Sequence, residues 1–500
     1  MQIAQFNGGL NTVINPSLIQ FSEAREFNNI DISSGVLKSS AEDTKLLDAV
    51  TSNLYWFNNL WLHTSSATNR SYVEYVGNIY YSSGAGIPQK SFDGLDWYNL
   101  GILKPFTMPT LGTLITGALN GTYQFCYTYY NSVDGSESMP SLYTADVVLA
   151  TQGITLGVVA SLDAQVDKIR IYRIGGNLTA MSLDIEVANV TGNYNLIADD
   201  ASILGNVLES YTYGQAPTNL MHLTEANAML FGALGNELHF TEIAKVDAWN
   251  PFNTISFDAD ITGIGSMQNG LLVFTRYKTY IVTGNSPETL SRYLLNGSQG
   301  CICHRTIGYI DNNLIWLSTD GICTSNGGDI VVESKGKLGK LKVVGPVVAM
   351  VHDSVYYLAH ATGIIALDTF HKAIITYDTV LDSFAIKEDE LYYSHNNELY
   401  KAFSSVVASS LTYHSPDFSE GSLSNLKTYK SVYIQKDTGS FEVTIYIDSV
   451  EVAKRTISKL VEEIKIPQEY RQGYYISFKI HGQGIIREIE YKVEGRQNGK

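Results

Sequence analysis

Asn313-Leu314-Ile315-Trp316-Leu317 is one copy of a short pattern in which a small or turn residue precedes an aliphatic residue and then aromatic or β-branched residues. The pattern returns about every 40 residues between positions 219 and 403, which is the length of one four-stranded blade of a β-propeller. Each copy is a short apolar run bounded by Asn, Asp, Gly or Ser, as expected of a buried strand. The other copies are Ala228-Met229-Leu230-Phe231, Gly270-Leu271-Leu272-Val273-Phe274, Ser354-Val355-Tyr356-Tyr357-Leu358 and Glu390-Leu391-Tyr392-Tyr393.

This spacing predicts an all-β fold built on a β-propeller of about six blades. The prediction depends on spacing and pattern alone, because the Gly-His and Trp-Asp signatures of the WD type are absent. A series of unrelated hairpins that happen to be evenly spaced is the alternative interpretation. No helix longer than two or three turns is expected anywhere in the chain.

The chain has 500 residues, too many for one hydrophobic core, and the repeat divides it into regions. Residues 104–217 interrupt the repeat with about seven short runs that alternate apolar and polar residues. After Ser404, four longer runs alternate in the same way, as in an antiparallel sandwich. The predicted domains are a leader with a propeller-closing strand (1–50), a first blade (51–103), an inserted immunoglobulin-like or fibronectin-like domain (104–217), the remaining blades (218–405) and a C-terminal β-sandwich (406–500).

Within the leader, Ser22-Glu23-Ala24-Arg25-Glu26 predicts one helical turn, and a strand is expected to begin in residues 33–38. A leader of this kind can supply the strand that closes a propeller and removes its free edges.

The composition is poor in charge and rich in tyrosine, with 17% charged residues and 33 tyrosines. Protein interfaces lose charged residues and gain aromatic ones, so this balance is typical of a chain with extensive interfaces. All-β proteins also favour tyrosine in their strands, and both causes can apply. The net charge of −16 argues against a protein that grips duplex DNA through its phosphates. No apolar run is long enough for a membrane span, and the first residues do not resemble a signal peptide.

No residue is predicted to be catalytic, to bind a cofactor or to ligate a metal. Cys301-Ile302-Cys303-His304 with Cys323 offers the residue types of a metal site. Strand alternation would place Cys301 and Cys303 on one face and His304 on the other, and a second Cys-x-x-Cys pair is missing, so packing is the favoured role. No nucleophile elbow, His-Glu-x-x-His helix or Walker loop occurs, and the chain is not expected to be an enzyme. Structural roles are expected for the scattered histidines His239, His304, His360, His371 and His395.

Several stretches resemble structural virion proteins of tailed phages. The opening of the chain resembles the start of many such proteins. The residues that carry this resemblance are Phe6-Asn7-Gly8-Gly9-Leu10-Asn11, Asn28-Asn29-Ile30-Asp31 and Gly35-Val36-Leu37. A second part of the chain resembles the propeller of the tail nozzle, tail hub or tail stabilisation protein of short-tailed bacteriophages. This part runs from Gly263-Ile264-Gly265 to Tyr280-Ile281-Val282-Thr283-Gly284 and includes Leu317-Ser318-Thr319-Asp320-Gly321-Ile322. The closing strands resemble the C-terminal sandwich of that family. None of these motifs is catalytic.

The resemblance implies a ring of copies of this chain in the virion tail, with six as the expected number, made in the host cytoplasm. The ring would lie below the portal and adaptor proteins, prolong the DNA channel, help to retain the genome and anchor tail fibres or spikes. Genomic DNA would pass without specific binding, and part of the negative charge is expected to face the channel, because an acidic wall does not hold phosphates. Ordinary solubility explains the excess of acid equally well.

A sialidase-like or carbohydrate-binding propeller, used for receptor binding or as a depolymerase, is the rival interpretation. It predicts a cleft lined by aromatic and carboxylate side chains, with measurable glycan turnover. A generic protein-binding propeller would instead be a monomer with one exposed groove.

Overall fold

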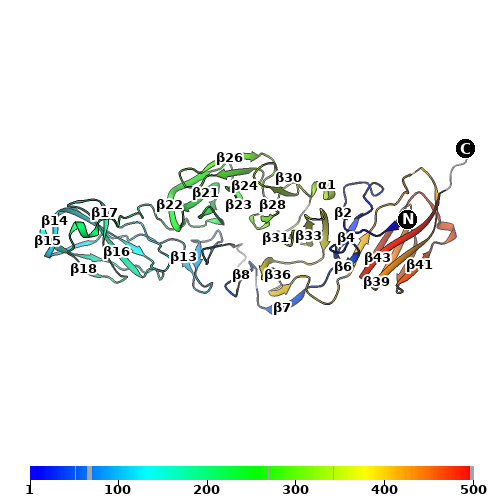
Figure 1. The fold of residues 1–500 in the computed structure, drawn as a ribbon, viewed down its shortest axis with the longest axis horizontal. Helices are drawn as coiled ribbons and strands as arrows, with labels where there is room; N and C mark the ends of the chain where they lie inside the picture. The colour runs from blue at the N-terminus through cyan, green and yellow to red at the C-terminus, as the bar shows by residue number, and fades with distance from the viewer. Residues whose placement is uncertain (51, 65–69, 269, 342, 423, 496–500) are drawn as a thin grey trace. The chain divides into compact units, whose positions relative to one another are not determined.

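The computed structural model describes residues 1–50, 52–64, 70–268, 270–341, 343–422 and 424–495. Throughout this part of the chain strands dominate, and the protein is all-β (Figure 1). The helical elements are one short α-helix, α1 (Lys335–Leu338), and three 3₁₀ turns, η1 (Asp200–Ile203), η2 (His304–Thr306) and η3 (Gln468–Tyr470). Among the described residues, no helix has the length and apolar character needed to cross a membrane.

The chain forms two compact units. Unit 1 comprises Met1–Ala67, Arg276–Thr279 and Leu295–Lys500, and unit 2 comprises Thr68–Thr275 and Tyr280–Leu294. Unit 2 combines three four-stranded antiparallel sheets with a five-stranded sheet, and unit 1 combines two four-stranded sheets with a 14-stranded sheet.

Unit 2 contains three four-stranded sheets that follow one another along the chain, apart from the end residues of the third. Buried side chains of the first and second sheets form one hydrophobic core, and those of the second and third form another. The first sheet is β10 (Ser71–Tyr75), β11 (Asn78–Ser82), β12 (Gln89–Ser91) and β13 (Tyr98–Asn99); the second is β19 (Met221–Ala226), β20 (Met229–Leu234), β21 (Glu237–Glu242) and β22 (Lys245–Ser256); the third is β23 (Ile261–Met267), β24 (Gly270–Thr275), β25 (Thr279–Thr283) and β26 (Ser291–Asn296).

Unit 1 contains three more sets of strands in the same arrangement. The last set gains its fourth strand from the N-terminal region, where β7 pairs antiparallel with β37. The sets are β27 (Gly308–Ile310), β28 (Asn313–Leu317), β29 (Ile322–Ser325) and β30 (Val331–Val332); then β31 (Val348–His352), β32 (Val355–His360), β33 (Gly363–Asp368) and β34 (Ala373–Tyr377); then β35 (Ser383–Lys387), β36 (Glu390–His395), β37 (Glu398–Lys401) and β7 (Thr44–Asp48).

The recurring apolar run forms the second strand of five of the six sets, as β20, β24, β28, β32 and β36, so all five predicted strands are confirmed. Several of these strands follow a two-residue turn in which both residues have positive φ, such as Asp311-Asn312 (48° and 62°) and Asp353-Ser354 (49° and 60°). Turns of this kind match the twist of antiparallel strands and favour Asn, Asp and Gly. The turn residue before each run is therefore the signal of a hairpin.

Residues 51–103 differ from the single blade that was predicted. Strands β8 (Tyr55–Phe57) and β9 (Leu60–Leu62) pair with each other in a two-stranded sheet of unit 1, whereas β10 to β13 form the first sheet of unit 2. The predicted helical turn at residues 22–26 is also wrong, because this segment contains β3 (Glu23–Ala24) and the start of β4 (Glu26–Asn28). Tertiary contacts explain this difference, since Arg25 N–H donates to the carbonyl of His414 and Glu23 accepts from Asn11.

The segment 104–217 contains five strands in one sheet, fewer and longer than the seven predicted. Strand β14 changes partner at Tyr123, pairing with β15 before this residue and with β16 after it. Side chains from β14, β15, β16 and β18 form the core of this sheet. In sheet order, the strands are β17 (Leu178–Ala188), β16 (Lys168–Gly175), β14 (Thr110–Tyr130), β15 (Val147–Val158) and β18 (Gly192–Leu196).

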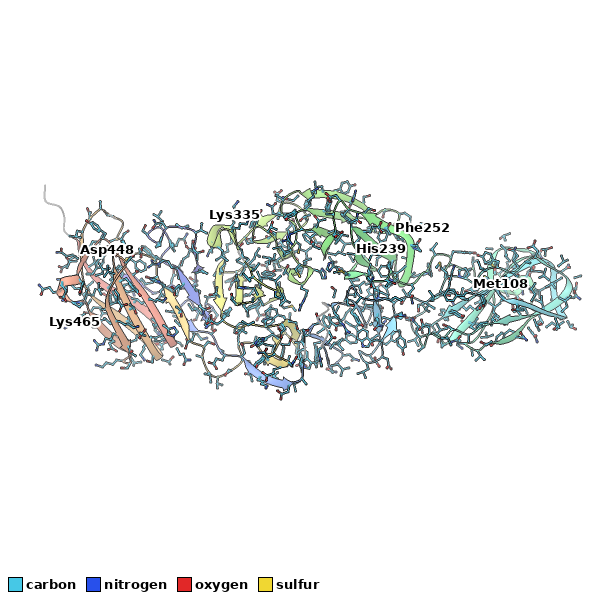
Figure 2. The ribbon with its side chains drawn as sticks, turned by 180° about the vertical axis from the view of Figure 1, so that it is seen from behind. Met108, His239, Phe252, Lys335, Asp448 and Lys465 are labelled. Atoms are coloured by element: carbon cyan, nitrogen blue, oxygen red, sulfur yellow. The ribbon has the colours of Figure 1, made fainter. Side chains whose placement is uncertain are left out.

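The C-terminal strands and the N-terminal strands share one sheet in unit 1 (Figure 1). Two long strands, β39 (Lys427–Ile447) and β43 (Ile476–Gly495), pair along almost their whole length. Glycine is required where they approach most closely, because a Cβ on Gly439 would lie 1.8 Å from the Gln483 carbonyl oxygen. Figure 2 labels Asp448 and Lys465, which belong to this region. The set β31 to β34 belongs to the same sheet, because β34 pairs parallel with β4. The other strands of the sheet are β38 (Leu411–His414), β40 (Val450–Ile457), β41 (Val461–Lys465), β42 (Gln472–Gly473), β1 (Gln2–Ile3), β5 (Ile30–Asp31) and β6 (Leu37–Ser39).

Acid sensitivity of unit 1 is expected from His414, whose Nε2 lies 2.9 Å from the Arg25 guanidinium. Burial and the neighbouring positive charge of Arg25 lower the pKa of His414 to about 4. The unfolded histidine binds a proton near pH ~6.5, so the unfolded state binds more protons as the pH falls below that value. Between about pH 6.5 and pH 4, His414 is therefore expected to cost ~1.4 kcal/mol of stability per pH unit.

Urea unfolding at about pH 7.0, 5.5 and 4.5, followed on the transition that belongs to unit 1, measures this effect. The expected change in the free energy of unfolding is ~1.4 kcal/mol for each pH unit. The His414→Gln variant is expected to show a shallower loss than the parent protein. His481→Gln is the matched control, because His481 is exposed and accepts or donates a single bond with Thr412. Parallel curves for the parent protein and the His414→Gln variant would contradict the assignment.

Candidate functional site

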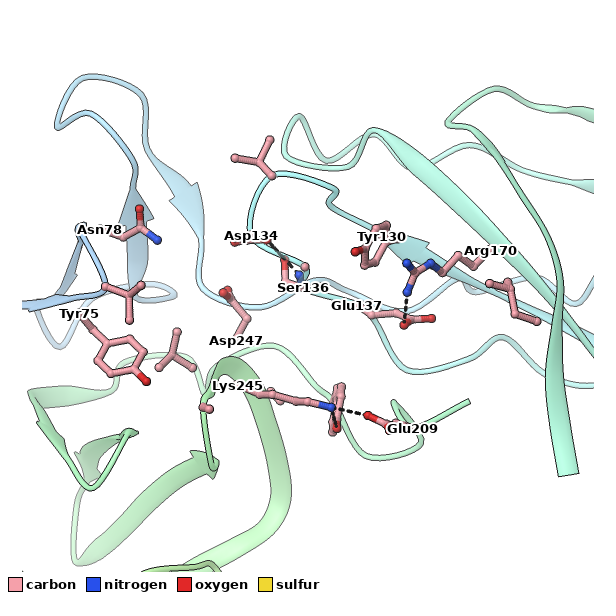
Figure 3. A pocket seen from close by; sticks show the side chains of 18 of the residues that line it. Tyr75, Asn78, Tyr130, Asp134, Ser136, Glu137, Arg170, Glu209, Lys245 and Asp247 are labelled. Atoms are coloured by element: carbon pink, nitrogen blue, oxygen red, sulfur yellow. Dashed lines mark hydrogen bonds and ion pairs between the residues drawn. The ribbon is translucent and has the colours of Figure 1, made fainter. Parts of the chain in front are cut away.

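A large cavity lies in unit 2, where the turn between residues 131 and 137 faces strands of the first and second sheets (Figure 3). Its volume is about 1290 Å³. Six aromatic side chains line it together with four carboxylates, two cationic side chains and several small polar groups. The aromatic residues are Tyr75, Tyr80, Phe92, Tyr130, Tyr172 and Tyr213, and the carboxylates are Asp134, Glu137, Glu209 and Asp247.

A buried lysine, Lys90 of β12, holds two of these carboxylates in place. Its side chain is 0% exposed, and its Nζ bonds Asp134 and lies 2.9 Å from Asp247 Oδ1. Asp134 sits in the turn between residues 131 and 137, and its Oδ1 accepts from the N–H and the hydroxyl of Ser136. Asp247 of β22 accepts a further bond from the Gly101 N–H at 2.9 Å. Burial raises the pKa of Asp247, and the positive charge of Lys90 opposes that rise.

A second cluster forms the wall contributed by β14 and β16. Glu137 accepts from Arg170 at 3.1 Å, from the Tyr172 hydroxyl at 2.8 Å and from Thr128 at 2.6 Å. The Arg170 guanidinium also lies over the ring of Tyr130, 3.3 Å from its centroid. Burial, with the negative charge of Glu137 next, raises the pKa of Tyr172, so its phenol stays protonated and keeps donating to the carboxylate.

The third group is more exposed. Lys245, at the start of β22, donates to Glu209 and to the Tyr213 hydroxyl, both at 2.6 Å. Its side chain is 41% exposed and that of Glu209 is 71% exposed. The bonds to Glu209 and Tyr213 raise the pKa of Lys245 against the effect of its partial burial. In Figure 3, Tyr75 and Asn78 lie on the opposite side of the opening from Arg170 and Glu137.

Each of the four lining carboxylates is therefore paired with a cation. The ion pair fixes the position of each carboxylate, so that its oxygens are hydrogen-bond acceptors of defined position. The cavity offers aromatic rings beside these acceptors and beside amide and hydroxyl groups. Such a surface suits a polar ligand of little charge better than a polyanion, because phosphates would approach four carboxylates.

Sequence reasoning did not single out Lys90, Arg170 or Lys245. Each stands in a strand and, by local pattern, is expected to face solvent. The local signal present in the sequence is the run Asp134-Gly135-Ser136, whose residues favour a turn and which positions Asp134 and Glu137. The partners of Lys90 come from two distant segments, so local sequence does not reveal its burial.

The cysteines are placed differently from the strand that was predicted at 301–303. Cys301 and Cys303 lie in an irregular segment before η2, and Cys301 donates to the Cys303 carbonyl at 3.2 Å. Burial raises the pKa of Cys301 to about 12 and that of Cys323 to about 11, which keeps both thiols protonated. Within the described ranges, these thiols and His304 are not among the residues close enough to share a metal ion.

The histidines named above lie in separate elements and do not converge. His239 is in β21, His360 ends β32 and His395 ends β36, while His371 bonds Asp368 at 2.9 Å and His304 begins η2. A different group, His352 with Asp353 and Asp389, has ligand atoms within 4.8 Å of one another. Both aspartates are exposed, and His352 Nε2 already bonds the Asp389 carbonyl at 2.8 Å.

No protein-family model matches this chain, and no curated protein matches it. Solved structures with distant similarity include Saccharomyces cerevisiae Sqt1, with 8% identity over 72% of this chain and 99% of that chain and a TM-score of 0.30. An exo-β-1,3-galactanase from Phanerochaete chrysosporium shares 6% identity over 90% of this chain and 100% of its own, with a TM-score of 0.20. Glutaminyl cyclase of Myxococcus xanthus shares 13% identity over 35% and 86% of the two chains, with a TM-score of 0.22. At these values the similarity does not extend to function.

Proposed function

We propose that this chain is a structural virion protein of a short-tailed bacteriophage that forms a tail nozzle or tail hub ring of six copies. The ring would lie below the portal and adaptor proteins, prolong the DNA channel, help to retain the genome and anchor fibres or spikes. The six sets of four strands would be the blades of one propeller, with β7 as the closing strand. Residues 104–217 would be the immunoglobulin-like or fibronectin-like insertion, and residues 406–500 the C-terminal sandwich.

The observation that carries the ring is an uncharged surface in unit 2. Residues 105–133, 147–162 and 187–198 contain no Lys, Arg, Asp or Glu. These stretches include β14, β15 and β18, which are adjacent strands of one sheet. Large apolar side chains in them are exposed, such as Val148 at 72%, Phe106 at 75% and Met108 at 52%. Met108 is labelled in Figure 2.

An uncharged surface of this extent supports contact with another copy. The chain has a net charge of −16, so two copies repel each other over most of their surfaces. Contact through strands without charge avoids this repulsion and buries the exposed apolar groups, and interface cores are depleted in charge. The leader, which carries one part of the phage resemblance, is integral to unit 1: Phe6 is 0% exposed, and β4 pairs with β38.

Imaging of intact virions is expected to show six copies in a closed ring in the tail. Val148→Glu should sharply reduce incorporation into particles, because it places a charge in the uncharged surface. Phe370→Glu is the matched control, since Phe370 is 81% exposed but belongs to unit 1, and this variant should be incorporated normally. One copy per particle, or a position away from the tail, would disprove the proposal.

A further inference from the structure

We propose that the cavity of unit 2 binds a neutral oligosaccharide and holds it without hydrolysing it. This site goes beyond the structural role proposed for the ring. The juxtaposition that carries it is an array of aromatic rings beside hydrogen-bonding groups whose positions are set by ion pairs.

The size of the cavity indicates a ligand of several sugar units. Sites for small molecules typically have volumes of about 300–1,000 Å³. The cavity here, at about 1290 Å³, exceeds that range. A single sugar would leave much of it filled with water, whereas a short chain of sugars would contact both walls.

The chemistry of the walls fits the two kinds of surface that a sugar presents. A pyranose ring has an apolar C–H face and a rim of hydroxyls that both donate and accept. Tyrosine offers the matching combination of an apolar ring and a polar tip. Tyr75 and Tyr213 are half-buried lining residues, so part of each ring is available at the surface. Asn78 and Asn206 add amide groups that both donate and accept, as the hydroxyls require.

The charges decide between a sugar and other polymers. Nucleic acid is disfavoured, because its phosphates would meet Asp134, Glu137, Glu209 and Asp247. An extended peptide usually pairs with a free sheet edge or fills apolar pockets. The lining combines small apolar side chains with six aromatic residues and three groups of ion pairs, so it offers a peptide no continuous apolar pocket.

The same ion pairs argue for binding without cleavage. Glycoside hydrolysis needs one carboxyl group that donates a proton and a second carboxylate that acts as nucleophile or base. Asp134 and Asp247 share the ammonium of Lys90, and Glu137 accepts three bonds, one of them from Arg170. A carboxylate held in this way serves as an acceptor for a sugar hydroxyl.

The test uses the full chain and an array of immobilised bacterial O-antigen and capsular polysaccharides, both neutral and acidic. The parent protein is expected to bind neutral members, and Tyr75→Ala should weaken that binding at least tenfold. Asn78→Ala is the second variant and should weaken it in the same direction. Tyr293→Ala is the matched control, because Tyr293 is 60% exposed in β26 of the same unit but does not line the cavity. Unchanged melting of unit 2 in all three variants shows that folding is intact.

Three results would overturn the site: failure to bind any neutral polysaccharide on the array, equal loss of binding in Tyr75→Ala and Tyr293→Ala, or preferential binding of a 20-base-pair DNA duplex in competition with the sugar. Release of reducing ends from a bound polysaccharide would refute the claim that the site does not hydrolyse its ligand. A chain that forms rings in virions yet binds no sugar would lose only this inference. Binding of sugar by a chain that is absent from tails would overturn the proposed function instead.

Discussion

Lys90→Met is expected to lower the free energy of unfolding of unit 2 by about 3–5 kcal/mol, because it leaves buried carboxylates without their cation. The Lys90 side chain is 0% exposed, and those of Asp134 and Asp247 are each 11% exposed. Methionine fills a similar volume, so the effect reports the lost charge rather than a cavity. Urea unfolding followed by a probe in unit 2 measures it.

Lys245→Met is the matched control in the same cavity. Its ion pair with Glu209 is largely exposed, and exposed pairs contribute about 0–1 kcal/mol. Equal destabilisation by the two substitutions would contradict the role given to burial.

The Lys90→Met variant should also recover stability as the pH falls. Burial already raises the pKa of Asp247, and removal of Lys90 raises it further. Unfolded aspartate titrates near pH ~3.9, so above that pH the folded variant retains a proton that the unfolded chain releases. The deficit relative to the parent protein should therefore shrink between pH 7 and about pH 5. A deficit that stays constant over this range would show that lost packing, rather than unpaired charge, causes it.

Trp316→Ala is expected to cost about 3–5 kcal/mol in unit 1, because it creates a cavity in a packed sheet. Trp316 lies in β28, is 0% exposed, and donates from Nε1 to the Gly300 carbonyl at 3.1 Å. Trp316→Phe keeps most of the volume and removes the hydrogen bond, so a smaller loss of about 1–3 kcal/mol is expected.

Tyr309→Ala serves as the control for Trp316, since Tyr309 belongs to the neighbouring strand β27 and is 47% exposed. Its loss should stay within about 1 kcal/mol. Comparable losses from Tyr309→Ala and Trp316→Ala would show that the sheet containing β28 does not support the stability of unit 1. Thermal unfolding followed by a probe in unit 1 makes the comparison.

Local sequence predicts a strand correctly where residues that favour a tight turn are followed by a continuous apolar run. The run at Asn313 was found because the turn residues with positive φ precede a continuous apolar segment. Strand β22 was missed, since Lys245, Asp247 and Asn250 break its apolar pattern. The segment at Glu23 predicts a helical turn, because its residues favour a helix and the local sequence does not show its distant partner Asn11.

The site could be predicted less well than the strands. Lys90 and Asp134 are 44 residues apart, and Asp247 belongs to a different sheet. Their convergence depends on how the insertion packs within unit 2, which neither periodicity nor propensity encodes. A lysine with polar neighbours in a short strand normally indicates a solvent-facing position, and here the topology reverses that expectation.

The sharing of one sheet by the two ends of the chain sets the order in which the protein can fold. The Met1 ammonium donates to the carbonyl of Tyr491, 490 residues away, and Ile3 pairs with Ile489. At a synthesis rate of about 5–20 residues per second, the first strand waits on the order of 25–100 s for its partner. Unit 2 draws on residues between Thr68 and Leu294, so its strands are all translated well before the partners of β1 appear. During translation, unit 2 can therefore fold while the N-terminal strands of unit 1 still expose unpaired backbone, the interval in which such a chain depends most on chaperones.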